Sequence, residues 1–489
     1  MSTKKIHAQP PEKLTGIEFK KIPSSAVGYK AIKSAITHIK EEVGLVKGIG
    51  LLAKLNQKNG FDCPGCAWPD PDEKRAFLAE YCENGAKAVA EEATKNRVSP
   101  LFFATHSISK LSELSDYEIG KKGRITHPVV VYEGRDHYEE ISWEDAFNMI
   151  GKELKSLPSP DEAIFYTSGR TSNEAAFLYQ LFVRKFGTNN LPDCSNMCHE
   201  SSGAALTETL GIGKGSVTLD DFNHAELVIV MGQNPGTNHP RMLTALGETK
   251  KRGGKIITIN PLPEVGLMRY NDPQNPIKWM GKGQKLTDVF LQVKINGDVA
   301  LLKIILKLLW QKEQETPGTI FDHEFIKTNT TGYEDFITDV ETYSIEKLIP
   351  QTGIDFKIIE EAATLIAQKK KIIICWAMGL TQHKNSVDNI RELVNLLLLK
   401  GSIGKQGAGT CPVRGHSNVQ GDRTMGIWEK PKEDFLDNLE KEFNFKAPRN
   451  HGYDVVDAIE AMHQKKARVF IGMGGNFLSA TPDTEYTAK

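Results

Sequence analysis

The chain has 489 residues, which is enough for roughly two to four domains with full-sized cores. Its 61 Lys and Arg residues nearly balance its 62 Asp and Glu residues, and the net charge of -1 provides no overall field for nucleic acid or an acidic membrane. The seven cysteines show no disulfide framework, no secretory signal opens the sequence, and no apolar run approaches the length of a bilayer span. We therefore expect a soluble cytoplasmic protein without nucleic-acid or membrane partners.

The N-terminal part predicts an extension followed by an irregular loop. Residues 1–58 are basic and rich in lysine, and an amphipathic stretch near 29–46 predicts one or two helices. The segment 60–71 contains so many Pro and Gly residues that it cannot form a regular helix or strand.

Three cysteines lie in and after this loop. Cys63 and Cys66 form a Cys-x-x-Cys pair, and Cys82 lies sixteen residues further on. The Pro-Gly turn inside the pair lets two thiols face one ion, and sulfur ligands select zinc or an iron–sulfur cluster. A fourth ligand would come from Asp70, His106 or a more distant residue. The alternative is a chance group of buried thiols that hold no metal.

Beyond residue 125, short apolar runs alternate with helical patterns. This alternation is typical of parallel sheets covered by helices, which is the doubly wound α/β class. Most of the runs end in Gly or Asn and open into polar loops, and doubly wound folds bind ligands at these carboxyl ends. The predicted strands are 128–133, 138–141, 163–169, 226–232, 255–260, 371–379 and 468–474, and the predicted helices include 146–157, 173–186 and 386–400.

The densest group of chemically active side chains lies in 193–203, where two thiols, an imidazole and a carboxylate precede a helical start at 204–206. A thiol at a helix N-terminus is favoured as the thiolate, which is both a nucleophile and a soft metal ligand. His199, next to Cys198, has a side chain suited to moving a proton. The alternative is a buried structural cysteine beside a solvated helix start.

Glycine-rich loops provide candidate anion sites. The strand-end loops 232–240 and 472–476 allow close approach of backbone N–H groups to a phosphate, although ordinary turns have similar sequences. A longer loop, 401–421, contains six glycines in 21 residues. Its Arg414 can hold a carboxylate or phosphate through two parallel hydrogen bonds. Long loops inside compact domains are usually functional, so we expect a polar or anionic ligand here.

Taken together, these motifs resemble the molybdopterin oxidoreductase family, and most closely proteins of the formate dehydrogenase alpha subunit type. The resemblance covers nearly the whole chain from about residue 60. It implies a multi-domain α/β protein with doubly wound, mostly parallel sheets and a small N-terminal domain of iron–sulfur type. The motifs are Cys63-x-x-Cys66, Cys82-x-x-Gly85, Gly169-Arg170-Thr171-Ser172-Asn173-Glu174, Asn196-Met197-Cys198-His199, Gly232-Gln233-Asn234-Pro235 and the run from Pro412 to Gly421.

The resemblance also implies domain boundaries. It divides the chain into an N-terminal extension, a small cysteine-containing domain and two α/β dinucleotide-binding domains, of which the first is discontinuous. The expected ranges are 1–58, 59–142, 143–194 plus 415–489, and 195–414.

The family's chemistry implies roles for individual residues. Its members hold molybdenum or tungsten between two molybdopterin guanine dinucleotides, the Mo-bis(molybdopterin guanine dinucleotide) cofactor. Carried over by motif, Cys198 becomes the metal ligand, His199 the proton acceptor and Arg414 the holder of a small anionic substrate. Two electrons would leave through the pterin and a 4Fe-4S cluster on Cys63, Cys66 and Cys82, toward an electron-acceptor protein. The implied dinucleotide contacts are Arg170, Asn173, Gln233, Asn234, Asn260, Gly415, His416, Asn418, Gln420 and Asn476.

The sequence departs from the family pattern at four points. Asp70 stands where the third cysteine of the cluster loop is usual, and Asn84 where a lysine is common. Asn260 replaces an acidic guanine contact. The family's C-terminal dinucleotide-binding domain is absent, and 479–485 resembles a helix start capped by Thr481, which together predict a truncated chain.

Two other functions are compatible with the same residues. The chain can be a non-catalytic module that binds the cofactor or a metal, or a scaffold stabilised by zinc on Cys63, Cys66 and Cys82. Metal content and a visible spectrum distinguish both from an oxidoreductase.

Overall fold

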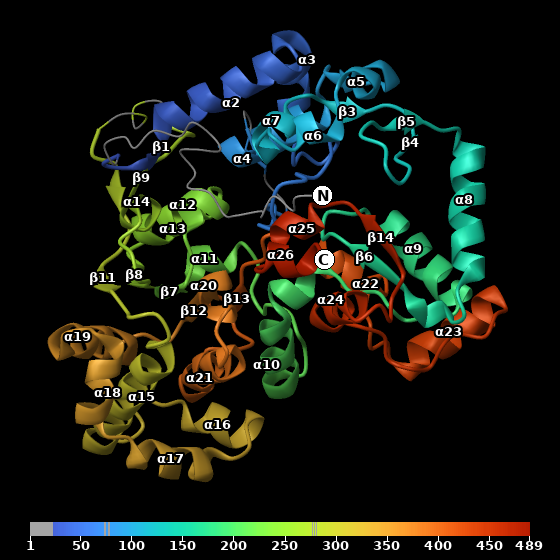
Figure 1. Cartoon of the computed structure of the whole chain (residues 1–489). Helices are drawn as coiled ribbons and strands as arrows, with labels where there is room; N and C mark the ends of the chain where they lie inside the picture. Colours follow the sequence, from blue (N-terminus) through green and yellow to red (C-terminus); the bar gives the residue numbers. More distant parts are fainter. Residues whose placement is uncertain (1–22, 73–74, 77–78, 276, 278, 280) are drawn as a thin grey trace.

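The computed structural model describes residues 23–489 except 73–74, 77–78, 276, 278 and 280. Two separate parallel sheets, each covered by helices, form its centre (Figure 1), which confirms the predicted α/β class. Among the described residues, no helix is both long and apolar enough to cross a membrane.

A helical layer at the N-terminal end carries the cysteine loop. After strand β1 (Ala26–Val27), helices α2 (Gly28–Glu42), α3 (Leu45–Leu52) and α4 (Glu83–Glu92) enclose a small core that includes Ile39 and Val89. The predicted amphipathic stretch is confirmed, but Gly44 breaks it into two helices because its backbone takes a φ of 91°. Since α2 packs on α4, the extension and the cysteine segment share one core. The domain boundaries stay a prediction.

Short elements connect this layer to the first sheet. The predicted strands near 128–133 and 138–141 are present as a shorter antiparallel pair, β4 and β5. Ser142 caps the following helix α8 (Trp143–Ser156) by accepting a hydrogen bond from the Asp145 N–H. The remaining elements are β2 (Arg97–Val98), α5 (Pro100–Thr105), α6 (Ile108–Leu111), α7 (Asp116–Gly120), β3 (Arg124–Ile125), β4 (Val129–Val130) and β5 (Glu139–Glu140).

The first α/β sheet pairs β6 (Ala163–Thr167) in parallel with β14 (Val469–Met473). Alternate side chains of β6 enter different cores, because Phe165 packs with α9 (Asn173–Phe186) and Ile164 packs with α24 (Val455–His463). Helix α9 has the predicted range and ends at Gly187, which takes the left-handed conformation. Also in this region are 3-10 helices η1 (Pro160–Glu162) and η2 (Cys194–Met197), and helices α22 (Val419–Thr424) and α23 (Glu433–Phe443).

The second sheet has five parallel strands in the order β11-β8-β7-β12-β13. The chain builds outward from β7 on one side and from β12 on the other, so the topological switch point lies between these two neighbours. One face packs on the large core of α10 (Glu200–Leu210), α15 (Asp298–Glu315), α19 (Phe356–Ala367) and α21 (Ser386–Leu399), and the opposite face packs on α13 (Met242–Lys251). The strands are β7 (Leu227–Met231), β8 (Lys255–Ile259), β11 (Val289–Leu291), β12 (Ile372–Trp376) and β13 (Gly409–Pro412).

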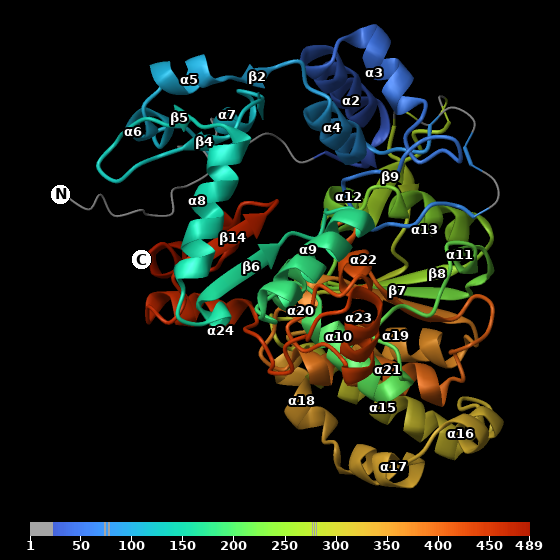
Figure 2. The same cartoon turned by 90° about the vertical axis from the view of Figure 1, so that its right-hand side faces the viewer.

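A group of helices forms a lobe below this sheet (Figures 1 and 2). Its members are α15 (Asp298–Glu315), α16 (His323–Asn329), α17 (Tyr333–Thr342), α18 (Ile345–Thr352), α19 (Phe356–Ala367) and α21 (Ser386–Leu399). The other elements are α10 (Glu200–Leu210), α11 (Asp221–His224), α12 (Pro235–Asn238), α13 (Met242–Lys251), α14 (Val265–Met268), β9 (Arg269–Asn271), β10 (Gln284–Lys285) and α20 (Met378–Thr381).

Two predicted helix starts are wrong. Helix α10 begins at Glu200, four residues before the predicted start, because His199 already serves as its N-cap residue. Thr481 is not an N-cap residue: it ends a short helix as its C-cap, and its hydroxyl donates to the Leu478 carbonyl at 2.9 Å. Asp483 caps α26 (Thr484–Thr487) instead by accepting from the Tyr486 N–H, and α25 (Phe477–Ala480) precedes it.

The ends of β7 and β12 approach each other through glycine backbone. The Gly379 N–H donates to the Gly232 carbonyl at 3.0 Å, and Gly232 has a φ of 56°. A Cβ at Gly232 would lie 2.7 Å from the Gly379 carbonyl carbon, and a Cβ at Gly379 would lie 2.6 Å from the Gly232 oxygen. Contacts this short force backbone to move, so the switch point excludes side chains at both positions.

We expect Gly232→Ala and Gly379→Ala each to lower the free energy of unfolding by about 1–3 kcal/mol, through steric overlap and, at Gly232, a strained backbone. Urea denaturation of the purified chain measures this. Gly151→Ala in α8 is the matched control, because its Cβ would meet nothing within 4 Å and a helical Ala is at least as stable as Gly. Equal stability of all three variants would contradict the close approach.

Candidate active site

Loops at the carboxyl edge of the five-stranded sheet bring Cys198 and Arg414 together. Cys198 follows η2, and Arg414 lies two residues after β13. Both side chains are buried. Burial raises the pKa of the Cys198 thiol, whereas the Gly415 N–H and the Arg414 guanidinium act in the opposite direction and favour the thiolate. The Cys198 carbonyl accepts a hydrogen bond from the Thr381 hydroxyl at 2.7 Å, which fixes this backbone against α20.

His199 is completely enclosed between α10 and the loop after β13. Its Nε2 lies 3.0 Å from the Val413 carbonyl and its Nδ1 lies 2.9 Å from the Ser202 hydroxyl. Burial, together with the positive charge of Arg414, lowers the pKa of the imidazole to about 3. His199 is therefore neutral near pH 7 and both of its ring nitrogens have protein partners.

Arg414 is held by backbone carbonyls. Its guanidinium donates to the His199 carbonyl at 3.3 Å and to the Gly213 carbonyl at 3.0 Å. Carbonyl partners carry no charge, so no ion pair with a described residue neutralises this guanidinium, although the charge of Glu200 acts on it from further away. The buried Nε has no partner among the described residues. The Arg414 carbonyl accepts a hydrogen bond from His239 Nε2 at 2.9 Å, so the backbone is fixed as well.

Gln233, just after the end of β7, contacts His239. Its Nε2 donates to His239 Nδ1 at 3.3 Å and to the Met242 sulfur at 3.1 Å. Its Oε1 is buried without a partner in the described structure, as is Nδ1 of His416. Unpaired buried polar atoms are costly and call for an explanation, and a polar ligand between these loops provides one.

The loops after β6 and β13 are joined through Asn418. Its Nδ2 donates to the Thr171 carbonyl at 2.6 Å and to Asn173 Oδ1 at 2.9 Å. Gly421 is required beside them, since a Cβ there would lie 2.1 Å from Asn418 Oδ1 and 2.4 Å from Asn173 Oδ1. Asn173 and Asn418, two of the predicted cofactor residues, are thus in direct contact.

The other predicted dinucleotide contacts lie away from these two loops, or their side chains cap a helix or bond to a nearby carbonyl. Asn476 caps α25 and contacts Asp116 on α7 at 3.4 Å. Asn234 caps α12, and Asn260 donates to the Leu262 carbonyl at 2.8 Å. Arg170 is exposed, but its charge acts on both Cys66 and His416. Arg170 therefore lies between the thiol segment and the loop after β13. Gln420 lies within α22. Their roles stay predictions.

The three thiols of the cysteine segment interact with one another. Burial raises the pKa of each, that of Cys82 to about 11, and Cys63 and Cys66 add to the rise at Cys82. The Gly65 and Gly85 N–H groups donate to the sulfurs of Cys63 and Cys82 at 3.3 Å. A Cβ at Gly85 would lie 2.9 Å from the Cys63 sulfur and 3.8 Å from that of Cys82, so this glycine lets two thiols converge.

The proposed fourth ligands are occupied by protein partners. Asp70 is paired with Arg241 at 2.6 Å and with Arg75 at 2.9 Å, and Glu80 shares Arg241 at 2.9 Å. His106 bonds the carbonyl of Phe102 and stacks on its ring. Within the described part of the chain, no group of three or more Cys, His, Asp or Glu side chains is gathered closely enough to hold one metal ion.

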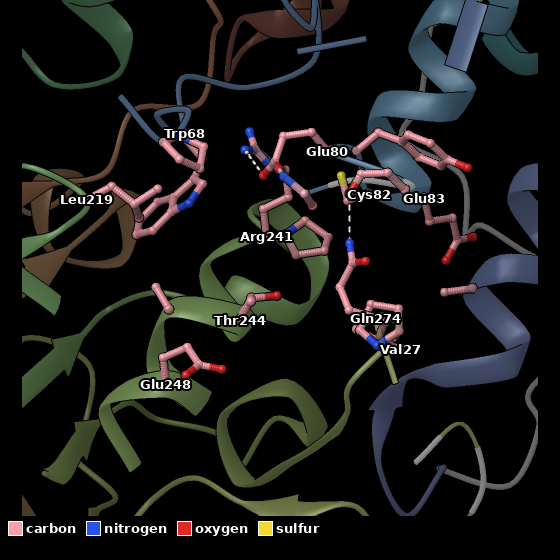
Figure 3. A pocket seen from close by; sticks show the side chains of 18 of the residues that line it. Val27, Trp68, Glu80, Cys82, Glu83, Leu219, Arg241, Thr244, Glu248 and Gln274 are labelled. Atoms are coloured by element: carbon pink, nitrogen blue, oxygen red, sulfur yellow. Dashed lines mark hydrogen bonds and ion pairs between the residues drawn. The ribbon is translucent and has the colours of Figure 1, made fainter. Parts of the chain in front are cut away.

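A cavity of about 1030 Å³ adjoins Cys82 (Figure 3). Arg241 and Glu80 lie on its wall beside the thiol, and Trp68 and Glu248 line other parts of it. Sequence reasoning missed Arg241, because no motif marks an arginine that follows a strand-end loop and pairs with two distant carboxylates.

A charge cluster close to Cys198 was also missed. Arg423 bridges Asp193 and Glu200, each at 2.8 Å. Asp422 is fully buried beside them, and its Oδ2 has no partner among the described residues. Burial, and then the charge of Asp193, raise the pKa of Asp422 to about 8. Arg423 lies more than 200 positions from Asp193 and Glu200, so no local pattern in the sequence indicates that they pair.

Residues 124–489 match the family model "Molybdopterin oxidoreductase", and the chain belongs to this family. An uncharacterised oxidoreductase of Mycobacterium tuberculosis is 53% identical over 462 residues, covering 94% of this chain and 59% of that protein. The protein YdeP of Escherichia coli is 45% identical over 480 residues, covering 96% and 63%. The resemblance found in the motifs is thereby confirmed.

More distant matches include a subunit of a formate dehydrogenase and a solved structure with a similar fold. The alpha subunit of the F420-dependent formate dehydrogenase 1 of Methanococcus maripaludis is 32% identical over 288 residues, covering 59% of this chain and 39% of that subunit. Acetylene hydratase from Pelobacter acetylenicus has a similar fold, with a TM-score of 0.56 and 19% identity over 74% of this chain and 50% of the other. The chain spans about 60% of the length of the Mycobacterium and Escherichia relatives.

Asp422 makes stability depend on pH. A carboxyl whose pKa is raised on folding stabilises the folded state fully below its unfolded pKa and loses this contribution as the pH rises through about 8. We subtract the free energy of unfolding of Asp422→Asn from that of the unchanged chain, and we expect this difference to fall by a few kcal/mol between pH 4 and 8. Urea titrations at several pH values measure it, with exposed Asp457→Asn as control. A constant difference would exclude the raised pKa.

Proposed function

We propose that the chain carries the catalytic region of a two-electron oxidoreductase of the formate dehydrogenase type, acting on a small anionic substrate at a molybdenum or tungsten centre. The observation that carries the proposal is the buried pairing of the Cys198 thiol with the unneutralised Arg414 guanidinium. A cationic fork next to a soft metal ligand suits an anion that must approach the metal.

The unpaired buried atoms support a polar cofactor between the same loops. Gln233, His416 and Arg414 each carry one, and the surface formed with Asn173 and Asn418 is suited to a molybdopterin guanine dinucleotide. When bound, the metal would supply two-electron redox chemistry. Cys198 would hold it as the thiolate, and Arg414 would orient the substrate through charge-assisted hydrogen bonds.

A proton released by the substrate needs an acceptor, and His199 is the proposed one. As a neutral imidazole it has one nitrogen that carries no proton, Nδ1, and this nitrogen lies against Ser202. Taking up a proton there therefore requires the Ser202 hydroxyl to turn its own proton away. The fully enclosed ring also excludes bulk water from competing for that nitrogen.

We further propose an iron–sulfur cluster held by Cys63, Cys66 and Cys82 alone. The three interacting thiols and the N–H groups directed at sulfur support this site. Asp70 is engaged by two arginines and is not a ligand in this proposal. Electrons would pass from the cluster to an electron-acceptor protein, and a cytoplasmic setting with reduced thiols suits the seven free cysteines.

The competing functions have less support. The zinc scaffold needs a fourth ligand beside the three thiols, and both candidates, Asp70 and His106, are engaged by protein partners. A non-catalytic cofactor module explains the unpaired atoms of the loops, but it gives no purpose to a buried, unneutralised Arg414 beside Cys198.

Metal analysis tests the catalytic proposal. Chain purified from cells supplied with molybdate or tungstate should contain that metal together with extractable pterin. Cys198→Ser should lose most of the metal, since a thiolate ligand is removed, whereas Cys194→Ser should retain it. Zinc alone without pterin in the unchanged chain would refute the proposal, and unchanged metal content in Cys198→Ser would refute the assigned ligand.

Iron and sulfide content tests the cluster separately. We expect Cys82→Ser to abolish the visible absorption of the cluster, and Asp70→Asn to leave the iron content unchanged because Asp70 is not a ligand. Cys411→Ser provides a control thiol outside the segment. Iron loss in Asp70→Asn without unfolding would show that the carboxylate binds iron after all, and absence of iron from the unchanged anaerobic protein would exclude the cluster.

A further inference from the structure

A closed ring of hydrogen bonds surrounds His199. The Trp376 indole Nε1–H donates to the Ser202 hydroxyl oxygen at 2.9 Å, and Ser202 lies 2.9 Å from His199 Nδ1. His199 Nε2 lies 3.0 Å from the Val413 carbonyl, and the Val413 N–H donates to the Trp376 carbonyl at 2.8 Å. All four residues are buried, so water does not compete for these bonds.

The chemistry of the partners fixes the direction of every bond in the ring. A carbonyl only accepts, so His199 Nε2 carries the proton that reaches Val413. The neutral imidazole then has a bare lone pair on Nδ1. An indole N–H only donates, so Ser202 accepts from Trp376 and its own hydroxyl proton is directed at His199 Nδ1. His199 is therefore held as a single tautomer, protonated at Nε2.

The ring joins three chain segments that carry the site. Trp376 ends β12, Ser202 lies in the first turn of α10, and Val413 follows β13 directly before Arg414. His199 is the neighbour of Cys198, and its carbonyl accepts a bond from the Arg414 guanidinium at 3.3 Å. Figure 1 shows these elements together where β12 and β13 meet α10. The ring thus connects the backbone of Cys198 to that of Arg414.

We propose that Ser202 is a positioning residue of the site: its hydroxyl, oriented by Trp376, locks His199 as the Nε2–H tautomer and thereby fixes Arg414 relative to Cys198. The geometry stands without a cofactor, whereas its catalytic meaning rests on the proposed function. Small displacements of a positioned group are costly in catalysis, so a ring that removes freedom from both loops serves the reaction.

Nitrogen NMR of the 489-residue chain, with histidine and arginine labelled by ¹⁵N, tests the proposal without any cofactor. His199→Gln identifies the His199 signals, and Arg414→Lys identifies the Arg414 Nε signal. We expect His199 to show one protonated nitrogen, Nε2, and one hydrogen-bonded lone-pair nitrogen, Nδ1. A proton found on Nδ1 would overturn the proposal.

Ser202→Ala should shift the Nδ1 signal toward that of an unbonded lone pair and speed exchange of the Nε2 proton about tenfold, because the ring is opened. The Arg414 Nε signal should move as well. Ser202→Thr, which keeps the hydroxyl, should restore the original signals. Ser201→Ala is the matched control, since its hydroxyl reaches the Thr381 carbonyl at 3.4 Å, outside the ring.

If Ser202→Ala does not fold, Trp376→Phe opens the ring at another hydrogen bond. It removes the indole donor and should release the Ser202 hydroxyl from its fixed direction, with the same shift at Nδ1. Trp310→Phe is its control, because that indole N–H donates to Glu341 outside the site. Unchanged His199 and Arg414 signals in the folded ring variants would refute the positioning role. A chain that lacks pterin but shows the predicted signals would instead refute only the proposed function.

Discussion

The contact between the backbones of Gly232 and Gly379 is the constraint on which the site depends. It brings the ends of β7 and β12 together at the point where strand order reverses, and two adjacent side chains would separate them. Only with this spacing do the loops that follow β7, β12 and β13 lie side by side. Gln233, His239 and Arg414 can then form one hydrogen-bonded series across three strands.

Polar groups buried around that junction divide into two kinds. Those of the ring through His199 and Ser202 have partners at every position, which is the condition under which a buried network rigidifies its surroundings. Single atoms of Gln233, His416 and Arg414 lack partners among the described residues. A rigid, satisfied layer therefore supports a surface with unmet hydrogen-bonding capacity, which is the arrangement expected of a preorganised ligand site.

The sequence predicted the elements better than their contacts. Strand β6, helix α9 and helix α21 follow from local patterns and from Gly187 and Gly401, because apolar periodicity and left-handed caps act within a few residues. Cys198, His199 and Arg414 were found through motifs. The Ser202–Trp376 bond and the Arg241–Asp70 pair were not, since they join positions more than 170 residues apart and neither residue type signals its partner.

Asp70 shows how one substitution changes a site through its neighbours. A cysteine at this position would bring a thiol with little need of a cation, whereas a buried carboxylate needs compensating charge. Arg241 and Arg75 provide it, and Glu80 in turn shares Arg241. The positive charge of Arg241 also lowers the pKa of Cys63 and Cys66 against the effect of burial. The arginine that takes Asp70 out of coordination thus favours the thiolate form of both cysteines, whereas the charge of Asp70 acts against it at Cys66.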